Sequence, residues 1–318
     1  MTKGITVKRT ALLTSLAATA VLGLAGCGSG EEDPLASDGG DSSDSGTSGP
    51  VVIGSANFPE NALLAEIYSG ALEGAGVETE TKLNIGSREV YLLALEPGDE
   101  SVDIFPEYTG VLRDYFDEDK SATGSASDEV YDELVERLPD YLTVLEASTA
   151  EDKDAVVVTQ ETADEYSLTE IGDLAEVSGD LTLGGPPEWK TRDTGIPGLE
   201  EVYGVTFADF KALDAGGPLT LNALLDGQVD AGNLFTTDPN IAAEGLVVLE
   251  DPEALFAAQN VVPLVRSEVL TDDIETTLNE VSAALDTDLL GELVTRVVID
   301  KEDPEDVAAD FLTEAGLD

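Results

Sequence analysis

From Val51 onward, short apolar segments alternate with segments of helical periodicity, and this alternation is the feature that most restricts the fold. The first helical segment, Pro59–Leu72, has a proline in its first turn, and three more helices are expected over 272–315. Alternating strands and helices are typical of α/β proteins with mainly parallel sheets. Extended segments are predicted at Val51–Ser55, Leu83–Ile85, Val102–Phe105, 155–159, 181–184, 210–213, 229–234, 246–249 and 261–265.

Two stretches of the chain share a pattern. Residues 94–103 read ALEPGDESVD and residues 223–230 read ALLDGQVD, so each has a helix ending in Ala-Leu, a glycine turn and a strand entered through aspartate. A polar segment follows each strand, PEYTG at 106–110 and TTD at 236–238. The pattern indicates two similar lobes, although unrelated α/β units can also coincide by chance. Ligands of open α/β sheets bind beyond the carboxyl ends of the strands, so two such lobes would enclose a cleft.

The first 50 residues differ in composition from the rest. Three basic residues precede an uncharged, mostly apolar run from Ala11 to Gly26, which is the layout of a secretory signal over 1–26. The run ends Leu-Ala-Gly-Cys and resembles the lipobox of bacterial lipoproteins, which implies lipidation of Cys27; the alternative is an ordinary signal with an incidental cysteine. The Gly/Ser/Asp-rich remainder of 27–50 is predicted to be a disordered tether. The mature protein is therefore expected on the extracytoplasmic face of the cell membrane, held by lipid alone.

The chain is strongly acidic, with a formal net charge of −52. Residues 1–26 hold three of the 15 basic residues and no acidic residue, so the mature chain retains 12 basic and 67 acidic residues. Such a surface repels nucleic acid, and either adaptation to high external salt or a generally acidic proteome explains it. Because there is no histidine and the one cysteine lies in the lipobox, nucleophilic triads and the usual zinc sites are excluded. No phosphate-loop motif is present, and neither an enzyme nor a metal or cofactor site is expected.

Six blocks in order resemble the glycine betaine/choline-type (osmoprotectant) substrate-binding proteins of ABC importers. They are VIGSANFPENALLAE at 52–66, GSREVYLLAL at 86–95, DIFPEYTG at 103–110, PPEWKTRDTGIPGLEEVYG at 186–204, LDGQVDAGNLFTTD at 225–238 and NVVPLVR at 260–266. The resemblance implies a type II periplasmic-binding-protein fold, with one lobe formed by 51–150 plus 258–318 and the other by 151–257. It also implies solute capture by hinge closure and docking on ABC permease subunits, and the protein is expected to be a monomer.

Betaines need two kinds of contact. Aromatic faces hold a quaternary ammonium, which lacks ordinary donors, whereas a carboxylate needs donors such as an arginine fork. The resemblance places Tyr108 in the aromatic cage and Arg192 on the ligand carboxylate; the alternatives are a core tyrosine and an arginine paired with Asp193 or Glu188. Trp189 is three residues before Arg192 and could either add an aromatic wall or pack in the second lobe.

The other cage positions depart from the family pattern. Asp154 stands near the place of one family tyrosine, Phe235 replaces a second, and Gln259 replaces a third. Because the match over 148–155 is loose, Asp152 is a second candidate for contact with a cationic head. A pocket with carboxylates and amides also suits a solute with N–H or O–H donors, such as an amino acid.

Five further residues are candidates either for ligand contact or for helix capping. Asn57 and Asn61 flank the start of the first helix, Ser87 and Thr109 stand where later helices should begin, and Thr237 follows a predicted strand. The sequence thus predicts a solute-binding protein for a quaternary amine or another zwitterion. A lipoprotein that senses the same solute without transporting it is the alternative.

Overall fold

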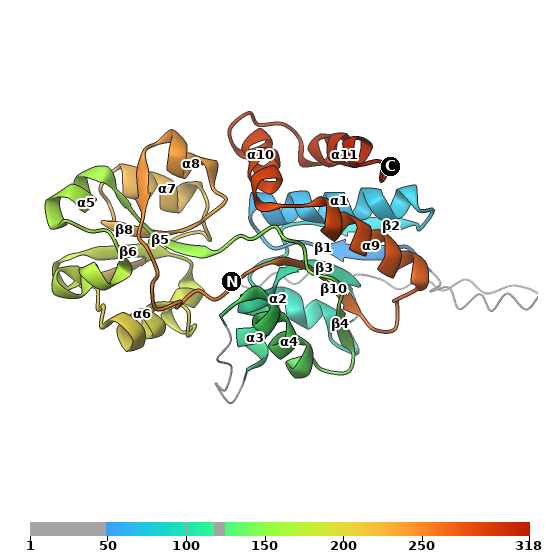
Figure 1. Ribbon diagram of the computed structural model, residues 1–318, viewed down its shortest axis with the longest axis horizontal. Helices are drawn as coiled ribbons and strands as arrows, with labels where there is room; N and C mark the ends of the chain where they lie inside the picture. Colours follow the sequence, from blue (N-terminus) through green and yellow to red (C-terminus); the bar gives the residue numbers. More distant parts are fainter. Residues whose placement is uncertain (1–48, 100, 118–124) are drawn as a thin grey trace, which may run out of the picture. The chain divides into compact units, whose positions relative to one another are not determined.

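The computed structural model describes residues 49–99, 101–117 and 125–318 (Figure 1). The predicted signal at 1–26, the lipidation site Cys27 and the tether up to residue 48 lie outside the described residues. The described residues belong to one compact unit that begins at Gly46. None of the helices described there combines the length and the apolar character needed to cross a membrane.

The first sheet has the strand order β2-β1-β3-β10-β4. Strand β1 runs parallel to β2 and β3, whereas β10 runs antiparallel to β3 and β4. The sheet is therefore mixed, because β10 comes from the far end of the chain and enters in the reverse direction. The strands are β1 (Val51–Gly54), β2 (Thr79–Lys82), β3 (Ile104–Tyr108), β4 (Leu142–Val144) and β10 (Val261–Arg266).

The second sheet repeats this arrangement in the order β7-β6-β8-β5-β9. Strand β6 is parallel to β7 and β8, whereas β5 is antiparallel to β8 and β9. The α/β prediction with two lobes is confirmed, and each lobe contains one reversed strand. The strands are β5 (Asp154–Thr159), β6 (Thr182–Gly185), β7 (Asp209–Ala212), β8 (Ala231–Phe235) and β9 (Leu246–Val248).

The repeated sequence pattern has the same contacts in both sheets. The carboxylate of Asp103, which precedes β3, accepts a hydrogen bond from the backbone N–H of Val52 at 2.9 Å. The carboxylate of Asp230, which precedes β8, accepts one from the N–H of Thr182 at 2.7 Å. Each aspartate thus ties the start of a central strand to its parallel neighbour, and the repeat is a structural one.

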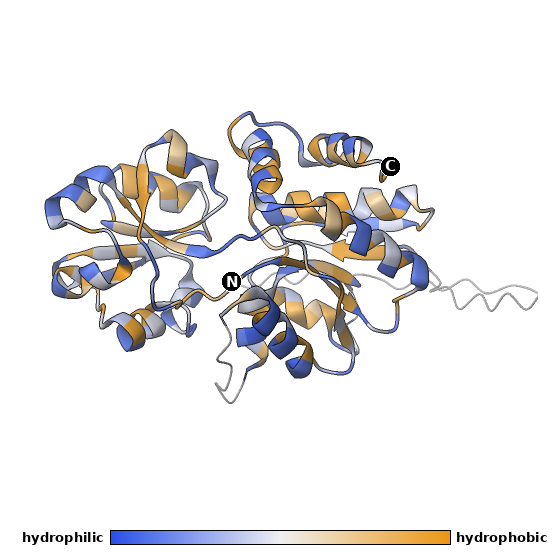
Figure 2. Ribbon diagram, in the orientation of Figure 1, coloured by the Kyte–Doolittle hydropathy of each residue, from blue (hydrophilic) through white to orange (hydrophobic). Residues whose placement is uncertain are grey.

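Helices cover both faces of each sheet. In the first half of the molecule, which is the first sheet with its helices, α1 and α9–α11 bury one apolar face of the sheet and α2–α4 bury the other (Figure 1). The second half is the second sheet with its helices. Figure 2 shows hydrophobic residues along the strands and mainly hydrophilic ones on α4. The helices are α1 (Pro59–Gly74), α2 (Arg88–Tyr91), α3 (Thr109–Phe116), α4 (Ser127–Arg137), α5 (Gln160–Tyr166), α6 (Ile196–Tyr203), α7 (Pro218–Leu225), α8 (Pro239–Ala243), α9 (Asp272–Ala284), α10 (Thr287–Val298) and α11 (Pro304–Ala315).

Two sequence predictions are corrected, and one strand that was not predicted is added. The extended segment expected at Leu83–Ile85 lies earlier, at β2, because this edge strand pairs through its backbone while its side chains alternate between half-buried and exposed. The backbone turns at Asn84, whose φ of 58° ends the strand. Strand β4 was not predicted, since three residues carry little periodicity. The helix expected to begin at Ser87 is a single turn of α2 followed by a 3-10 helix that ends at Leu95.

Two chain segments connect the sheets side by side. The N–H of Ser148 donates to the carbonyl of Val261 at 2.8 Å, and the N–H of Asp152 donates to the carbonyl of Gln259 at 3.1 Å. An antiparallel bridge joins residues 151 and 260 between them. The two crossings therefore form a short two-stranded ribbon between the sheets.

Candidate functional site

A cavity of about 370 Å³ opens where the carboxyl ends of the central strands of both sheets meet. Its wall combines segments that follow β1 and β3 with the start of β5 and the segments that follow β6 and β8. This is the place where open α/β sheets bind ligands. The position of the site therefore follows from the strand topology.

Three aromatic rings form a cluster at this cavity. The ring of Phe58 lies 6.1 Å from that of Tyr108 and 4.9 Å from that of Phe235, measured between centroids. Tyr108 and Phe235 are the last residues of β3 and β8, five residues after the equivalent aspartates that precede these strands. The internal repeat thus places one aromatic ring from each sheet at the same cavity.

Two aspartates give the cavity a carboxylate wall. Asp154 is buried at the start of β5 and accepts a hydrogen bond from the Asn233 side-chain amide at 2.8 Å. Asp152 is also buried and accepts from Thr236 and from the N–H of Thr237. Among the described residues, their hydrogen-bond donors are neutral groups. Both carboxyl groups are therefore placed where a cation in the cavity can reach them.

Burial changes the ionisation of these acids. Desolvation raises the pKa of Asp154, although the hydrogen bond from Asn233 acts against it. Desolvation also raises the pKa of Asp152 well above its ordinary value, and the nearby carboxylate of Glu60 adds to the rise. A cation in the cavity would favour the ionised aspartates, so its binding should release protons.

Glu60 connects the two halves behind the aromatic cluster. Its carboxylate accepts from the Tyr108 hydroxyl at 2.7 Å and from the Thr237 hydroxyl at 2.6 Å. Burial raises the pKa of Glu60, and these hydrogen bonds act in the opposite direction. Because Glu60 and Asp152 are close enough to affect each other, the two carboxyl groups titrate as a pair.

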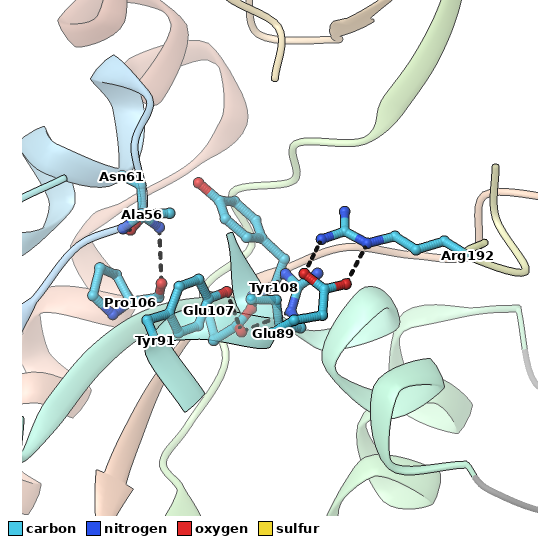
Figure 3. Close-up of polar contacts among 9 residues, drawn as sticks. Ala56, Asn61, Glu89, Tyr91, Pro106, Glu107, Tyr108 and Arg192 are labelled. Carbon is cyan, nitrogen blue, oxygen red and sulfur yellow. Dashed lines mark hydrogen bonds and ion pairs between the residues drawn. The ribbon is translucent and has the colours of Figure 1, made fainter. Parts of the chain in front are cut away.

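A buried ionic group supports the first half of the wall (Figure 3). The guanidinium of Arg88 donates twice to Glu107, each time at 2.9 Å. Tyr91 donates its hydroxyl to the same carboxylate at 2.6 Å, and the N–H of Tyr108 donates at 2.9 Å. Glu107 is fully buried, so these donors compensate its lost hydration. The group holds Arg88 and Tyr91 in the cavity wall.

A second arginine fork lies at the edge of the same cavity. The Nε and Nη2 atoms of Arg192 donate to the two carboxylate oxygens of Glu89, both at 3.0 Å (Figure 3). Glu89 belongs to α2 in the first half, whereas Arg192 follows β6 in the second. Partial burial acts to raise the pKa of Glu89, but the hydrogen bonds and charge of Arg192 outweigh it and hold the pKa at about 2.

Most of the residues proposed from sequence come together here. Thr237 lies beside them and contributes to an adjoining cavity of about 230 Å³, whose wall shares Phe58 and Phe235 with the first. The proposed residues in the wall of the larger cavity are Asn57, Ser87, Tyr108, Asp152, Asp154, Arg192, Phe235 and Gln259.

The other three have structural contacts and are not among the described residues that line the larger cavity. The Asn61 side chain accepts from the N–H of Ala56 and donates to the Pro106 carbonyl, so it ties α1 to β3. Thr109 is fully buried and binds the backbone of the second crossing segment. Trp189 is fully buried in the core of the second half, with its ring 6.1 Å from that of Phe256.

The expected helix caps differ as well. Thr109 is the first residue of α3, and Tyr108 occupies the capping position. Ser87 stands at the capping position of α2 but makes no capping hydrogen bond, and the cap of α1 is Phe58 rather than Asn57. Arg192 pairs with Glu89, a partner that sequence did not indicate.

Several wall residues were missed in the sequence. Phe58 comes just after β1, so the rule that ligands bind beyond strand ends could have identified it. Asn233 lies within β8, and no local signal distinguishes it from a core position. Its Oδ1 atom is buried and, among the described residues, has no hydrogen-bond partner.

Comparisons with known proteins agree with this geometry. A family model described as the substrate binding domain of an ABC-type glycine betaine transport system matches residues 49–314. The glycine betaine-binding protein YehZ of Escherichia coli is 29% identical over 279 residues, which cover 84% of this chain and 91% of that protein. A glycine-betaine-binding protein of Pseudomonas aeruginosa is 29% identical over 282 residues, covering 83% and 88%. A crystal structure of a glycine betaine/carnitine/choline ABC transporter has a TM-score of 0.64 at 25% identity, covering 84% of this chain and 99% of that chain.

Proposed function

This chain belongs to the family of substrate-binding domains of ABC-type glycine betaine transport systems, and we propose that it captures a small quaternary amine for an ABC importer. The proposed solutes are cations such as choline and zwitterions such as glycine betaine. The solute is bound and handed on without chemical change, so the protein acts as a receptor and not as an enzyme.

The observation that carries this proposal is the meeting of aromatic rings and carboxylates in one cavity. Phe58, Tyr108 and Phe235 provide π-faces, and Asp152 and Asp154 provide carboxyl groups that a cation favours in their ionised form. A quaternary ammonium has no N–H group, so it is held by cation–π attraction to the rings and by Coulomb attraction to ionised carboxylates. A single good cation–π contact contributes roughly 0.5–2 kcal/mol, depending on how far it is desolvated.

Hinge closure around the solute is part of the proposal. We assign one lobe to 51–150 plus 258–318 and the other to 151–257, because the two connecting segments pair beside each other at their boundary. Paired segments of this kind can absorb a rotation by small changes in a few backbone dihedrals. The Glu60–Thr237 contact would then form as the lobes close.

A second solute class is favoured by the amides in the wall. The unpartnered Oδ1 of Asn233 accepts hydrogen bonds, and Gln259 lies in the same wall. A solute with N–H donors, such as an amino acid, would satisfy these groups, whereas glycine betaine, which has no N–H or O–H donor, would not. A sensing role without transport would use the same site.

The location and partners follow from the sequence features. We propose that Cys27 carries the lipid anchor and that the monomer docks on ABC permease subunits at the extracytoplasmic face. A Cys27→Ser variant should lose its membrane-bound fraction on cell fractionation and should incorporate no labelled fatty acid. Retention in the membrane fraction would contradict the anchor.

The proposed function is tested by titrating the purified chain in a calorimeter with glycine betaine, choline, carnitine, ectoine and amino acids, at low and high salt. Micromolar binding of a quaternary amine is expected, and Tyr108→Ala should weaken it. Tyr115→Ala is the matched control, because Tyr115 is 41% exposed on α3, outside the larger cavity. Binding of an amino acid with no quaternary amine binding would establish the second class instead.

A further inference from the structure

Both arginines in the cavity wall are held by glutamates of this same chain. Arg88 is bound by Glu107 and Arg192 by Glu89, in each case through two hydrogen bonds to the two carboxylate oxygens. A guanidinium fork accepts one carboxylate in this bidentate geometry. A solute carboxylate that approaches either fork therefore meets a carboxylate that is already there.

The two pairs differ in how easily they can open. The Glu107 side chain is fully buried, so Arg88 cannot exchange its partner without leaving a buried charge unpaired. The Glu89 side chain is 42% exposed, and that of Arg192 is 24% exposed. Glu89 can rotate into solvent at a lower cost than Glu107, since water can hydrate a partly exposed carboxylate. A solute carboxylate can thus replace Glu89 at Arg192, whereas it cannot replace Glu107 at Arg88.

We propose that Glu89 is a specificity-determining residue: an internal carboxylate that occupies the fork of Arg192 and makes the cavity prefer cations without a carboxylate over zwitterions. The inference rests on the proposed function, because it concerns quaternary amines in this cavity. A zwitterion has to displace Glu89 before it gains the fork. A simple cation leaves the Glu89–Arg192 pair intact.

The remaining charges of the wall act in the same direction. Asp152 and Asp154 attract a cationic head, and the hydrogen-bond donors that they have among the described residues are neutral. In their ionised form the same two aspartates repel a solute carboxylate. Because Arg192 is paired with Glu89, less of its charge is left to offset that repulsion. Glu89 therefore occupies the one guanidinium of the cavity wall that could bind a solute carboxylate.

The test measures the Kd of choline and of glycine betaine for the full chain, the Glu89→Gln variant and a control, by calorimetry at low salt. Glu89→Gln should tighten glycine betaine roughly tenfold, which is about 1.4 kcal/mol. Choline should weaken or stay within about threefold, since the variant frees a positive charge. Glu96→Gln is the matched control, because Glu96 is exposed on the same segment, outside the cavity wall, and its loss changes net charge equally.

A double variant separates exchange at the fork from a general change of charge. The gain in glycine betaine affinity should vanish in Glu89→Gln/Arg192→Gln, because it requires the freed guanidinium. The proposal is overturned if Glu89→Gln leaves glycine betaine unchanged, or if the gain survives in the double variant. It is also overturned if Glu89→Gln weakens both solutes equally, since the pair would then be a latch for the closed lobes. Absence of binding by either solute to every folded variant would instead reject the quaternary-amine function itself.

Discussion

The two halves of this molecule have the same strand order and the same aspartate contacts, yet matching positions carry opposite chemistry. Four residues after Asp103, β3 carries Glu107, which is fully buried against Arg88 and Tyr91. Four residues after Asp230, β8 carries Leu234, which is fully buried in an apolar cluster. One backbone arrangement is therefore stabilised by an ionic group in one half and by apolar packing in the other.

The aspartates themselves show the same contrast. Asp103 receives a second interaction from Arg266, whose Nη1 lies 2.9 Å from its Oδ1 atom, and Arg266 also pairs with Glu268. The first half thus fixes its strand ends through charges. The difference teaches that fold symmetry preserves the position of the site, while the side chains of each half supply different parts of it.

The largest effect should come from replacing the buried glutamate of the first half by the apolar side chain that the second half has at the matching position. Glu107→Leu should lower the free energy of unfolding by about 3–5 kcal/mol, because Arg88 is left buried without its counterion. Combining it with Arg88→Met should recover at least half of that loss, since apolar residues of similar volume can replace a buried ion pair. Urea unfolding followed by circular dichroism measures both changes. If Glu107→Leu alone is as stable as the parent, the buried ionic group does not stabilise the first half.

A smaller difference is expected between the two aspartates. Asp103→Asn should cost about 2 kcal/mol, because a charged hydrogen bond to Arg266 is weakened, whereas Asp230→Asn should cost about 1 kcal/mol through one backbone contact. Thermal unfolding of the paired variants tests this order. Equal costs would mean that the ion pair adds nothing to the contact shared by both halves.

The aromatic rings at the strand ends should contribute similarly from each half. Tyr108→Ala and Phe235→Ala should each weaken choline by about 0.5–2 kcal/mol, which is the range of a cation–π contact. Tyr108→Phe should retain most of the affinity, because the ring stays and only the hydroxyl contact with Glu60 is lost. If calorimetry finds an effect for one ring only, the binding site is asymmetric.

The smallest effect concerns the carboxyl pair that joins the halves. The pKa values of Glu60 and Asp152 are raised, mainly by burial, so a proton remains bound to the pair above the ordinary range of carboxyl groups. A cation favours the ionised form, so choline affinity should rise with pH through the raised pKa values. We expect the choline binding free energy to change by about 1 kcal/mol over this pH range, and Asp152→Asn should make it nearly independent of pH. Calorimetry at several pH values measures both; an unchanged pH dependence in the variant would show that other groups cause it.

The sequence predicted the sheets better than the wall of the site. Strand and helix alternation, the internal repeat and the three C-terminal helices are readable, because buried apolar faces impose a period on the chain. Edge strand β2 was misplaced because it has no apolar residue, and β4 was missed because it is only three residues long. Tyr108 and Phe235 were found through the resemblance to the family, and each ends a strand that follows the repeated motif.

The sequence did not predict which residues, distant along the chain, would pair in the structure. Arg192 was singled out, but its partner Glu89 is 103 positions away, and nothing in either local segment connects them. Trp189 stands beside Arg192 in the chain and still packs in the core, because neighbouring residues of a turn point in different directions. The sequence by itself determined the α/β architecture, the repeat and the location of the site beyond the strand ends. Only the tertiary structure decided which charges meet there, because ionic partners are selected by distances in space that no local period encodes.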